Sequence, residues 1–221
     1  VYWAVTLGLM VLYAGKQALF AEATPFPNPF ETFFLLPDED YPLLPVGWTL
    51  VHEMYFYAVV SLFVLQRKIG VLAFLGVWAG IIATAHLAGL AGVNSWTRVA
   101  FSPLTFEFIG GALIALLIRR GATAMAAPAL IAGGLFAFRL SAAFAPQLYP
   151  DAVADLARRV LIFGPPFALI LYGAAAIEAR SGARAPQWLV AAGDASYSLY
   201  LVHVPVFLVI GKSLSLVLPD G

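Results

Sequence analysis

The chain of 221 residues is 62% hydrophobic and only 11% charged, with a mean hydropathy of +0.90. A soluble domain is about 45–50% apolar and about 25% charged, so this composition indicates a polytopic membrane protein. The net charge of zero gives no support to a nucleic-acid partner, and the absence of cysteine excludes disulfides, thiol nucleophiles and thiolate metal sites.

Seven apolar segments follow one another along the chain. Because lipid offers the backbone no hydrogen-bonding partner, these long continuous runs favour helices over the short alternating strands of a membrane barrel. We therefore expect an all-α fold, a polytopic transmembrane helix bundle with about seven spans. The Ala- and Gly-rich stretch at 121–134 predicts a closely packed helix. The expected segments are about 1–21, 47–66, 69–91, 98–118, 124–144, 159–178 and 188–217.

The loop at 22–46 differs in composition from its surroundings. It holds five acidic residues and six prolines but no lysine or arginine, which predicts an extended, non-cytoplasmic segment that folds over a site. Basic pairs lie in the loops at 67–68, 119–120 and 180–184, and the positive-inside rule assigns this side to the cytoplasm. Four arginines on the outer side weaken the rule without reversing it: Arg98, Arg139, Arg158 and Arg159.

Glu53 is an acid inside the second apolar segment. A carboxylate at the bilayer centre costs a few kcal/mol unless it is paired or faces water, so Glu53 is a functional candidate. In a helix beginning near Trp48, it shares one face with Thr49 and Tyr57, and at 1.5 Å per residue it lies roughly 8 Å below the outer end of the span. Alternatively, the Glu53 carboxylate accepts a hydrogen bond from a neighbouring helix or extends toward the membrane–water interface.

His52 and Glu107 are further polar candidates. His52 points about 100° away from Glu53 around a helix, and it is interpreted either as a base with a pKa near neutral or as a packing residue at the lipid interface. Glu107 also lies within an apolar segment, where Gly110 and Gly111 leave space for another backbone or a ligand. It belongs either to a polar site or to an interhelical hydrogen bond.

A polar stripe follows the last apolar segment. Ser196, Tyr200 and His203 share one helix face, and such a stripe usually lines the interior of a bundle. His203 is therefore a catalytic base or a structural hydrogen bonder. The three histidines have neither His-x-x-x-His nor His-Glu-x-x-His spacing, so no metal site is expected.

Four ordered motifs together resemble the membrane-bound acyltransferase 3 family, and in particular its exopolysaccharide-modifying, succinoglycan acetyltransferase-like branch. The first resembles the family signature Trp-(Ser/Thr)-Leu-x-x-Glu-x-x-x-(Phe/Tyr), with His52 at an open position. The segments 104–111, 159–178 and 193–203 are similar to three further family helices, the last through Ser-Tyr-Ser-Leu-Tyr-Leu-Val-His. The residues that match the first signature are Trp48, Thr49, Leu50, Glu53 and Tyr57.

The resemblance implies an acyltransferase, of the class that moves groups other than aminoacyl groups, in the bacterial inner membrane. The donor would be a cytoplasmic acyl-CoA, most often acetyl-CoA, and no bound cofactor is expected. The acceptor would be a hydroxyl of an exopolysaccharide or another cell-surface glycan, including a lipid-linked sugar. Residues 1–221 would then form part of a single integral-membrane acyltransferase domain in contact with membrane lipid.

The resemblance also implies that the chain is a fragment lacking the first two of about ten helices and the last one. The histidine to which the family's catalysis is assigned would lie in the absent first helix, with an arginine as its companion. Glu53 would support that histidine as a catalytic residue, and we expect the fragment alone to be inactive. The residues that would contact substrate are Trp48, Tyr57, Glu107, Tyr200 and His203.

A second class of function stays open at this stage. In a non-enzymatic transporter or flippase for a glycan or lipid-linked sugar, the same buried acids would form a polar pathway. An inactive piece of a larger protein is a third interpretation.

Overall fold

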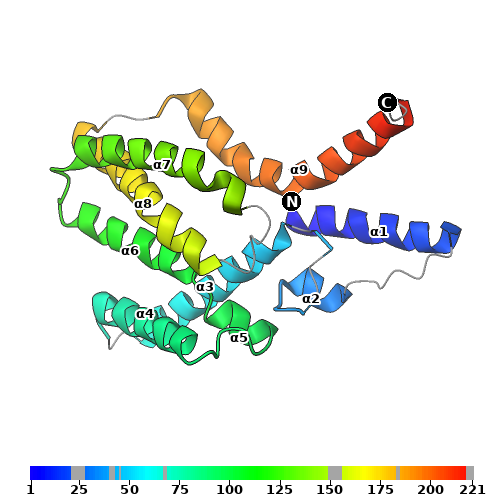
Figure 1. Ribbon diagram of the computed structural model, residues 1–221, viewed down its shortest axis with the longest axis horizontal. Coiled ribbons are helices and arrows are strands. Elements are labelled where there is room, and N and C mark those ends of the chain that lie inside the picture. The colour runs from blue at the N-terminus through cyan, green and yellow to red at the C-terminus, as the bar shows by residue number, and fades with distance from the viewer. Residues whose placement is uncertain are drawn as a thin grey trace. The chain divides into compact units, whose positions relative to one another are not determined.

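The computed structural model describes residues 1–20, 28–39, 43–44, 46–66, 69–148, 156–182 and 185–217. Every regular element in these ranges is a helix (Figure 1). Seven long helices match the seven predicted segments: α1 (Tyr2–Phe20), α3 (Gly47–Gln66), α4 (Val71–Leu87), α6 (Thr105–Arg119), α7 (Ala126–Leu148), α8 (Leu156–Ser181) and α9 (Gln187–Val217).

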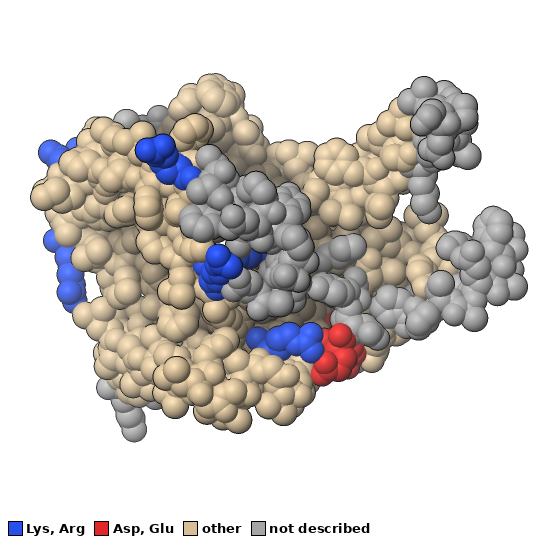
Figure 2. Space-filling model, in the orientation of Figure 1, with Lys and Arg blue, Asp and Glu red and all other residues tan. Residues whose placement is uncertain are grey.

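The helices have the length and composition of membrane spans. Four stretches in the described part of the chain are long and apolar enough to cross a bilayer: Gly47–Leu65, Ser95–Arg119, Leu156–Ser181 and Gln187–Gly211. Shorter apolar helices cover Tyr2–Gly15, Val71–Leu87 and Ala126–Leu140. The all-α membrane bundle is thus confirmed, and the chain is a multi-pass membrane protein. On the face seen in Figure 2, uncharged residues form most of the described surface.

The segment predicted at 98–118 is interrupted. A short helix, α5 (Ser95–Ala100), ends before Pro103, and α6 begins at Thr105. Proline has no N–H to donate and disfavours helical geometry at the residue before it, which explains the break. The side chain of His86 donates from Nε2 to the Phe101 carbonyl at 2.8 Å and so satisfies a backbone group that the break leaves outside the helices.

The loop predicted to be extended contains a turn of helix. In α2 (Pro29–Phe34), the Asn28 side chain accepts a hydrogen bond from the Phe30 amide at 3.1 Å, and Pro29 occupies the first helical position. Both are ordinary helix-start signals. The helix ends at Leu35, which adopts a left-handed φ of 54°. The expectation of a fully extended loop was therefore wrong for this part of it.

The chain divides into two compact units, each described here by itself. The first unit comprises Val1–Tyr55, Asn94–Val99 and Ala185–Gly221, and the second comprises Phe56–Val93 and Ala100–Arg184. The core of the first unit brings α1, the loop before α3, α3 and α9 together. Its buried members are Tyr2, Leu44, Val46, Leu50 and Leu201.

In the first unit, an ion pair ties the loop to α5. The Glu39 carboxylate accepts from the Ser95 amide at 2.6 Å and from the Arg98 guanidinium at 2.6 Å. The hydrogen bond from the Ser95 amide, helped by the Arg98 charge, holds the pKa of Glu39 below its ordinary value. Both charged side chains are exposed, so the contact positions the loop more than it stabilises the unit.

Acid is expected to release this contact. Because the folded state lowers the pKa of Glu39, the contact is fully present above the ordinary glutamate pKa and is lost as the pH falls through the lowered value. Hydrogen exchange should show a Ser95 amide that is protected at neutral pH and loses protection in acid. Glu39→Ala should remove the protection at neutral pH, whereas Asp38→Ala should keep it. Protection that is the same in acid and at neutral pH would contradict the assignment.

The second unit is organised around the antiparallel pair α7 and α8, which lie side by side (Figure 1). Glycines make this close approach possible. A Cβ atom at Gly133 would lie 2.7 Å from the Pro166 carbonyl oxygen, and one at Gly173 would lie 2.7 Å from the Ala126 carbonyl oxygen. The closely packed helix predicted from the small residues is therefore present.

An aromatic cluster joins α3, α4 and α6 in the same unit. Phe56 stacks on Phe108 with ring centroids 4.4 Å apart and on Trp78 at 5.6 Å. Phe63 stacks on Phe74 at 4.1 Å. Stacked aromatic pairs contribute beyond their buried area, so they fix the register of these three helices.

Candidate functional site

The candidate site in the first unit begins at the start of α3. The Thr49 hydroxyl donates to the Val46 carbonyl at 3.0 Å and holds the first turn in place. His52 donates from Nδ1 to the Trp48 carbonyl at 2.9 Å, and its ring meets the Trp48 ring edge to face at 5.7 Å. The Nδ1 atom of His52 is thus bound to its own helix, and the choice between a base and a packing residue stays a prediction.

A hydroxyl pair joins α3 to α9. The Thr49 and Tyr200 hydroxyls lie 2.7 Å apart although the two residues are 151 positions apart in the sequence. The Tyr200 hydroxyl also lies 3.3 Å from the Val46 carbonyl, so its single proton is shared between that carbonyl and the Thr49 hydroxyl. The structure therefore brings the motif around Glu53 together with the motif that ends at His203, and the sequence alone did not predict this pair.

His203 lies one turn further along α9. It donates from Nδ1 to the Tyr200 carbonyl at 2.5 Å, and its ring lies between those of Tyr200 and Phe207. In the neutral imidazole this arrangement leaves Nε2 as an acceptor. The hydroxyl of Ser196 donates to the Gly193 carbonyl at 2.6 Å and is satisfied within its own helix.

Glu53 is half-buried on α3. Among the side chains that the structure describes, none forms a hydrogen bond or an ion pair with its carboxylate. Tyr57 follows one helical turn later and is 55% exposed. In this respect Glu53 differs from Glu39, whose carboxylate is bound by Ser95 and Arg98.

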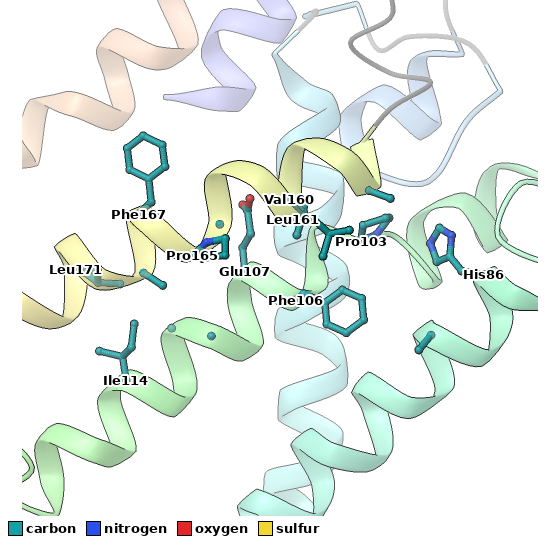
Figure 3. A pocket seen from close by; sticks show the side chains of 16 residues that line it. His86, Pro103, Phe106, Glu107, Ile114, Val160, Leu161, Pro165, Phe167 and Leu171 are labelled. Atoms are coloured by element: carbon teal, nitrogen blue, oxygen red, sulfur yellow. The ribbon is translucent and has the colours of Figure 1, made fainter. Parts of the chain in front are cut away.

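Glu107 lies in the second unit, where it lines a cavity of about 730 Å³ between α6 and α8. Figure 3 shows its carboxylate directed from α6 toward α8 near Pro165, with His86 of α4 at another end of the cavity. A Cβ atom at Gly110 or Gly111 would meet no atom within 4 Å, so these glycines leave the space that their pattern predicted.

The predicted residues thus fall into two groups. Trp48, Glu53, Tyr200 and His203 belong to the first unit, whereas Tyr57 and Glu107 belong to the second. The roles predicted for them remain predictions. Apart from the glycines, no pattern in the sequence predicted the cavity, and none placed His86 in its wall.

The sequence model described as an acyltransferase domain matches residues 1–219. The chain belongs to the acyltransferase 3 family. The exopolysaccharide production protein ExoZ of Rhizobium meliloti (strain 1021) is 32% identical over 230 residues. That alignment covers 96% of this chain and 66% of the relative, so the chain spans slightly less than two thirds of the relative's length. No solved structure matches this acyltransferase 3 chain. The resemblance found from the motifs is confirmed.

Removing the hydroxyls that join α3 to α9 should expose their coupling. Thr49→Val and Tyr200→Phe each remove one hydroxyl with little change of shape. A double-mutant cycle on unfolding in detergent should give an interaction free energy of about 0.6–1.5 kcal/mol, the range for such hydrogen bonds. Strictly additive effects of the two substitutions would show that the hydroxyl pair does not stabilise the unit.

Proposed function

We propose that the protein containing this chain is a membrane O-acyltransferase of the bacterial inner membrane. It transfers an acyl group, most often acetyl, from acyl-CoA to a hydroxyl of an exopolysaccharide or another cell-surface glycan, free or lipid-linked. The observation that carries the proposal is the acyltransferase family match across residues 1–219. The relative named as an exopolysaccharide production protein supports the choice of a glycan acceptor.

The reaction sets clear demands on the site. The acceptor oxygen attacks the thioester carbonyl, the carbon–sulfur bond breaks, and the acceptor proton ends on the departing thiolate to give free CoA. A base must take the proton, and positive groups must stabilise the oxyanion. In this proposal, the base is the histidine that the family resemblance implies, and Glu53 orients it and stabilises its positive charge.

The remaining candidates contact the substrates. Trp48 supplies an aromatic ring at the start of α3, and Tyr200 and His203 present polar atoms from α9. The His203 Nδ1 proton is held by a backbone carbonyl, so the ring is oriented with Nε2 available to a substrate hydroxyl. Tyr57, exposed on α3, and Glu107, in the cavity of the second unit, are assigned to substrate contacts away from the reacting atoms.

Mass spectrometry of the surface polysaccharide tests this function. A strain from which the complete gene is deleted should produce a glycan that lacks the mass of the acyl ester, and the complete gene should restore it. A complemented strain that carries the Glu53→Gln variant should resemble the deletion. An identical acylation pattern with and without the gene would contradict the proposed acceptor.

A further inference from the structure

The cavity of the second unit has a distinctive lining. Its sixteen lining residues come from α4, the turn before α6, α6 and α8, and only Glu107 and His86 among them carry polar side chains. The remaining wall consists of aliphatic, aromatic, proline and glycine residues. Its volume of about 730 Å³ lies within the range of roughly 300–1,000 Å³ that is usual for ligand pockets.

Both polar groups offer hydrogen-bond acceptors. The carboxyl group of Glu107 offers acceptor oxygens, so a ligand donor opposite it would be satisfied. His86 already uses its Nε2 proton on the Phe101 carbonyl, and the neutral ring leaves Nδ1 as an acceptor. A phosphate or carboxylate headgroup in this cavity would meet acceptors and no lining side-chain donor, at the full cost of desolvating its charge.

Arg159 of α8 bears on whether the ligand group that donates to Glu107 is cationic or neutral. It acts electrostatically on Glu107 from α8, so the acid already has a positive neighbour. A cationic ligand would lose its hydration in this apolar cavity and would compete with Arg159 for the carboxylate, whereas a neutral hydroxyl can donate to Glu107 without a charge of its own. The lining therefore favours a neutral donor group attached to an apolar body.

We propose that this cavity binds an amphiphile composed of an apolar chain that ends in a hydroxyl group. The hydroxyl donates to Glu107, and the chain lies over Gly110 and Gly111 against Phe167 and Leu171 of α8. Such a ligand is either a membrane lipid with a free hydroxyl or a free polyisoprenol, the unphosphorylated form of a glycan carrier lipid. The second source rests on the proposed function, whereas binding itself does not require acyl transfer.

Photo-crosslinking tests the proposal on the full-length protein in liposomes. The probes are a long-chain primary alcohol with a diazirine in its chain and the carboxylic acid of the same chain. The alcohol should label peptides of α6 and α8 about tenfold more than the acid does, as expected for one charge-assisted hydrogen bond gained or lost. Excess unlabelled alcohol should remove the labelling. Equal labelling by the two probes would overturn the proposal.

Paired variants locate the site. Gly111→Leu should fill the cavity and abolish labelling of α6 and α8, because Gly111 lines the cavity. Gly134→Leu on α7 should leave the labelling unchanged, because Gly134 does not line it. The two variants are matched, since a Cβ atom at either glycine would have no atom within 4 Å. Glu107→Leu should remove the preference for alcohol over acid. Labelling that survives Gly111→Leu would overturn the proposal, even in a protein that transfers acyl groups normally.

Competition identifies the source of the hydroxyl. Displacement of the probe by a polyisoprenol, but not by diacylglycerol, assigns the cavity to a free polyisoprenol. Displacement by diacylglycerol alone assigns it to a membrane lipid. Either result supports the hydroxyl-terminated chain as the ligand, and failure of both to displace the probe counts against it.

Discussion

Glu53→Gln in the full-length protein is expected to lower acyl transfer by roughly 100-fold or more, the scale of a lost acid–base function. The substitution keeps the size of the side chain and removes only its charge. Glu53 has no hydrogen-bond or ion-pair partner among the described side chains, so the loss of charge should disturb packing little. Initial rates with labelled acetyl-CoA, together with the folded yield of the variant, measure the effect.

A matched control uses another glutamate of the same chain. Glu178 is exposed in the last turns of α8, and Glu178→Gln should transfer acyl groups at the normal rate. A pH profile separates a positioning role from a purely structural one, because Glu53→Gln should also shift the apparent pKa of the base to a lower value. Normal transfer by Glu53→Gln would show that the acid has no part in the chemistry.

Gly133→Ala is expected to destabilise the second unit by about 1–3 kcal/mol, the usual cost of overpacking. The new methyl group would lie 2.7 Å from the Pro166 carbonyl oxygen and 2.9 Å from the Ile170 amide nitrogen. Both are backbone atoms of α8 and cannot rotate away, so α7 and α8 must separate. Unfolding in detergent, followed by circular dichroism, measures the change.

The adjacent glycine is the control. Gly134→Ala adds the same methyl group on the same helix, but nothing lies within 4 Å of it. It should be neutral or slightly stabilising, because alanine has the higher helix propensity. Similar stabilities for the two variants would mean that the α7–α8 contact is looser than the structure describes.

The helices could be predicted from the sequence because the lipid environment imposes one requirement throughout the chain. Every apolar run must satisfy its own backbone, and six of the seven predicted segments became helices within about four residues of their expected bounds. The break before α6 was missed because the hydrophobic pattern continues through Phe101, although Pro103 marked it. The turn of α2 was missed because proline was interpreted as extending the loop and not as starting a helix.

The candidate site could be predicted only in part. Helical periodicity separated Glu53 from His52, and the structure accordingly shows His52 bound to its own helix. By contrast, no local pattern could place Tyr200 against Thr49, because that contact depends on how α9 packs against α3. The cavity depends in the same way on the separation of α6 and α8, which the packing of many side chains determines.

The most direct test of the proposed function follows one acyl group. The full-length protein in membrane vesicles is supplied with acetyl-CoA labelled in its acetyl group and with the glycan of its own host. We expect label on the glycan in a linkage that mild base releases, and none with Glu53→Gln. Movement of the glycan across the vesicle membrane without any transfer of label would contradict it and would identify a transporter.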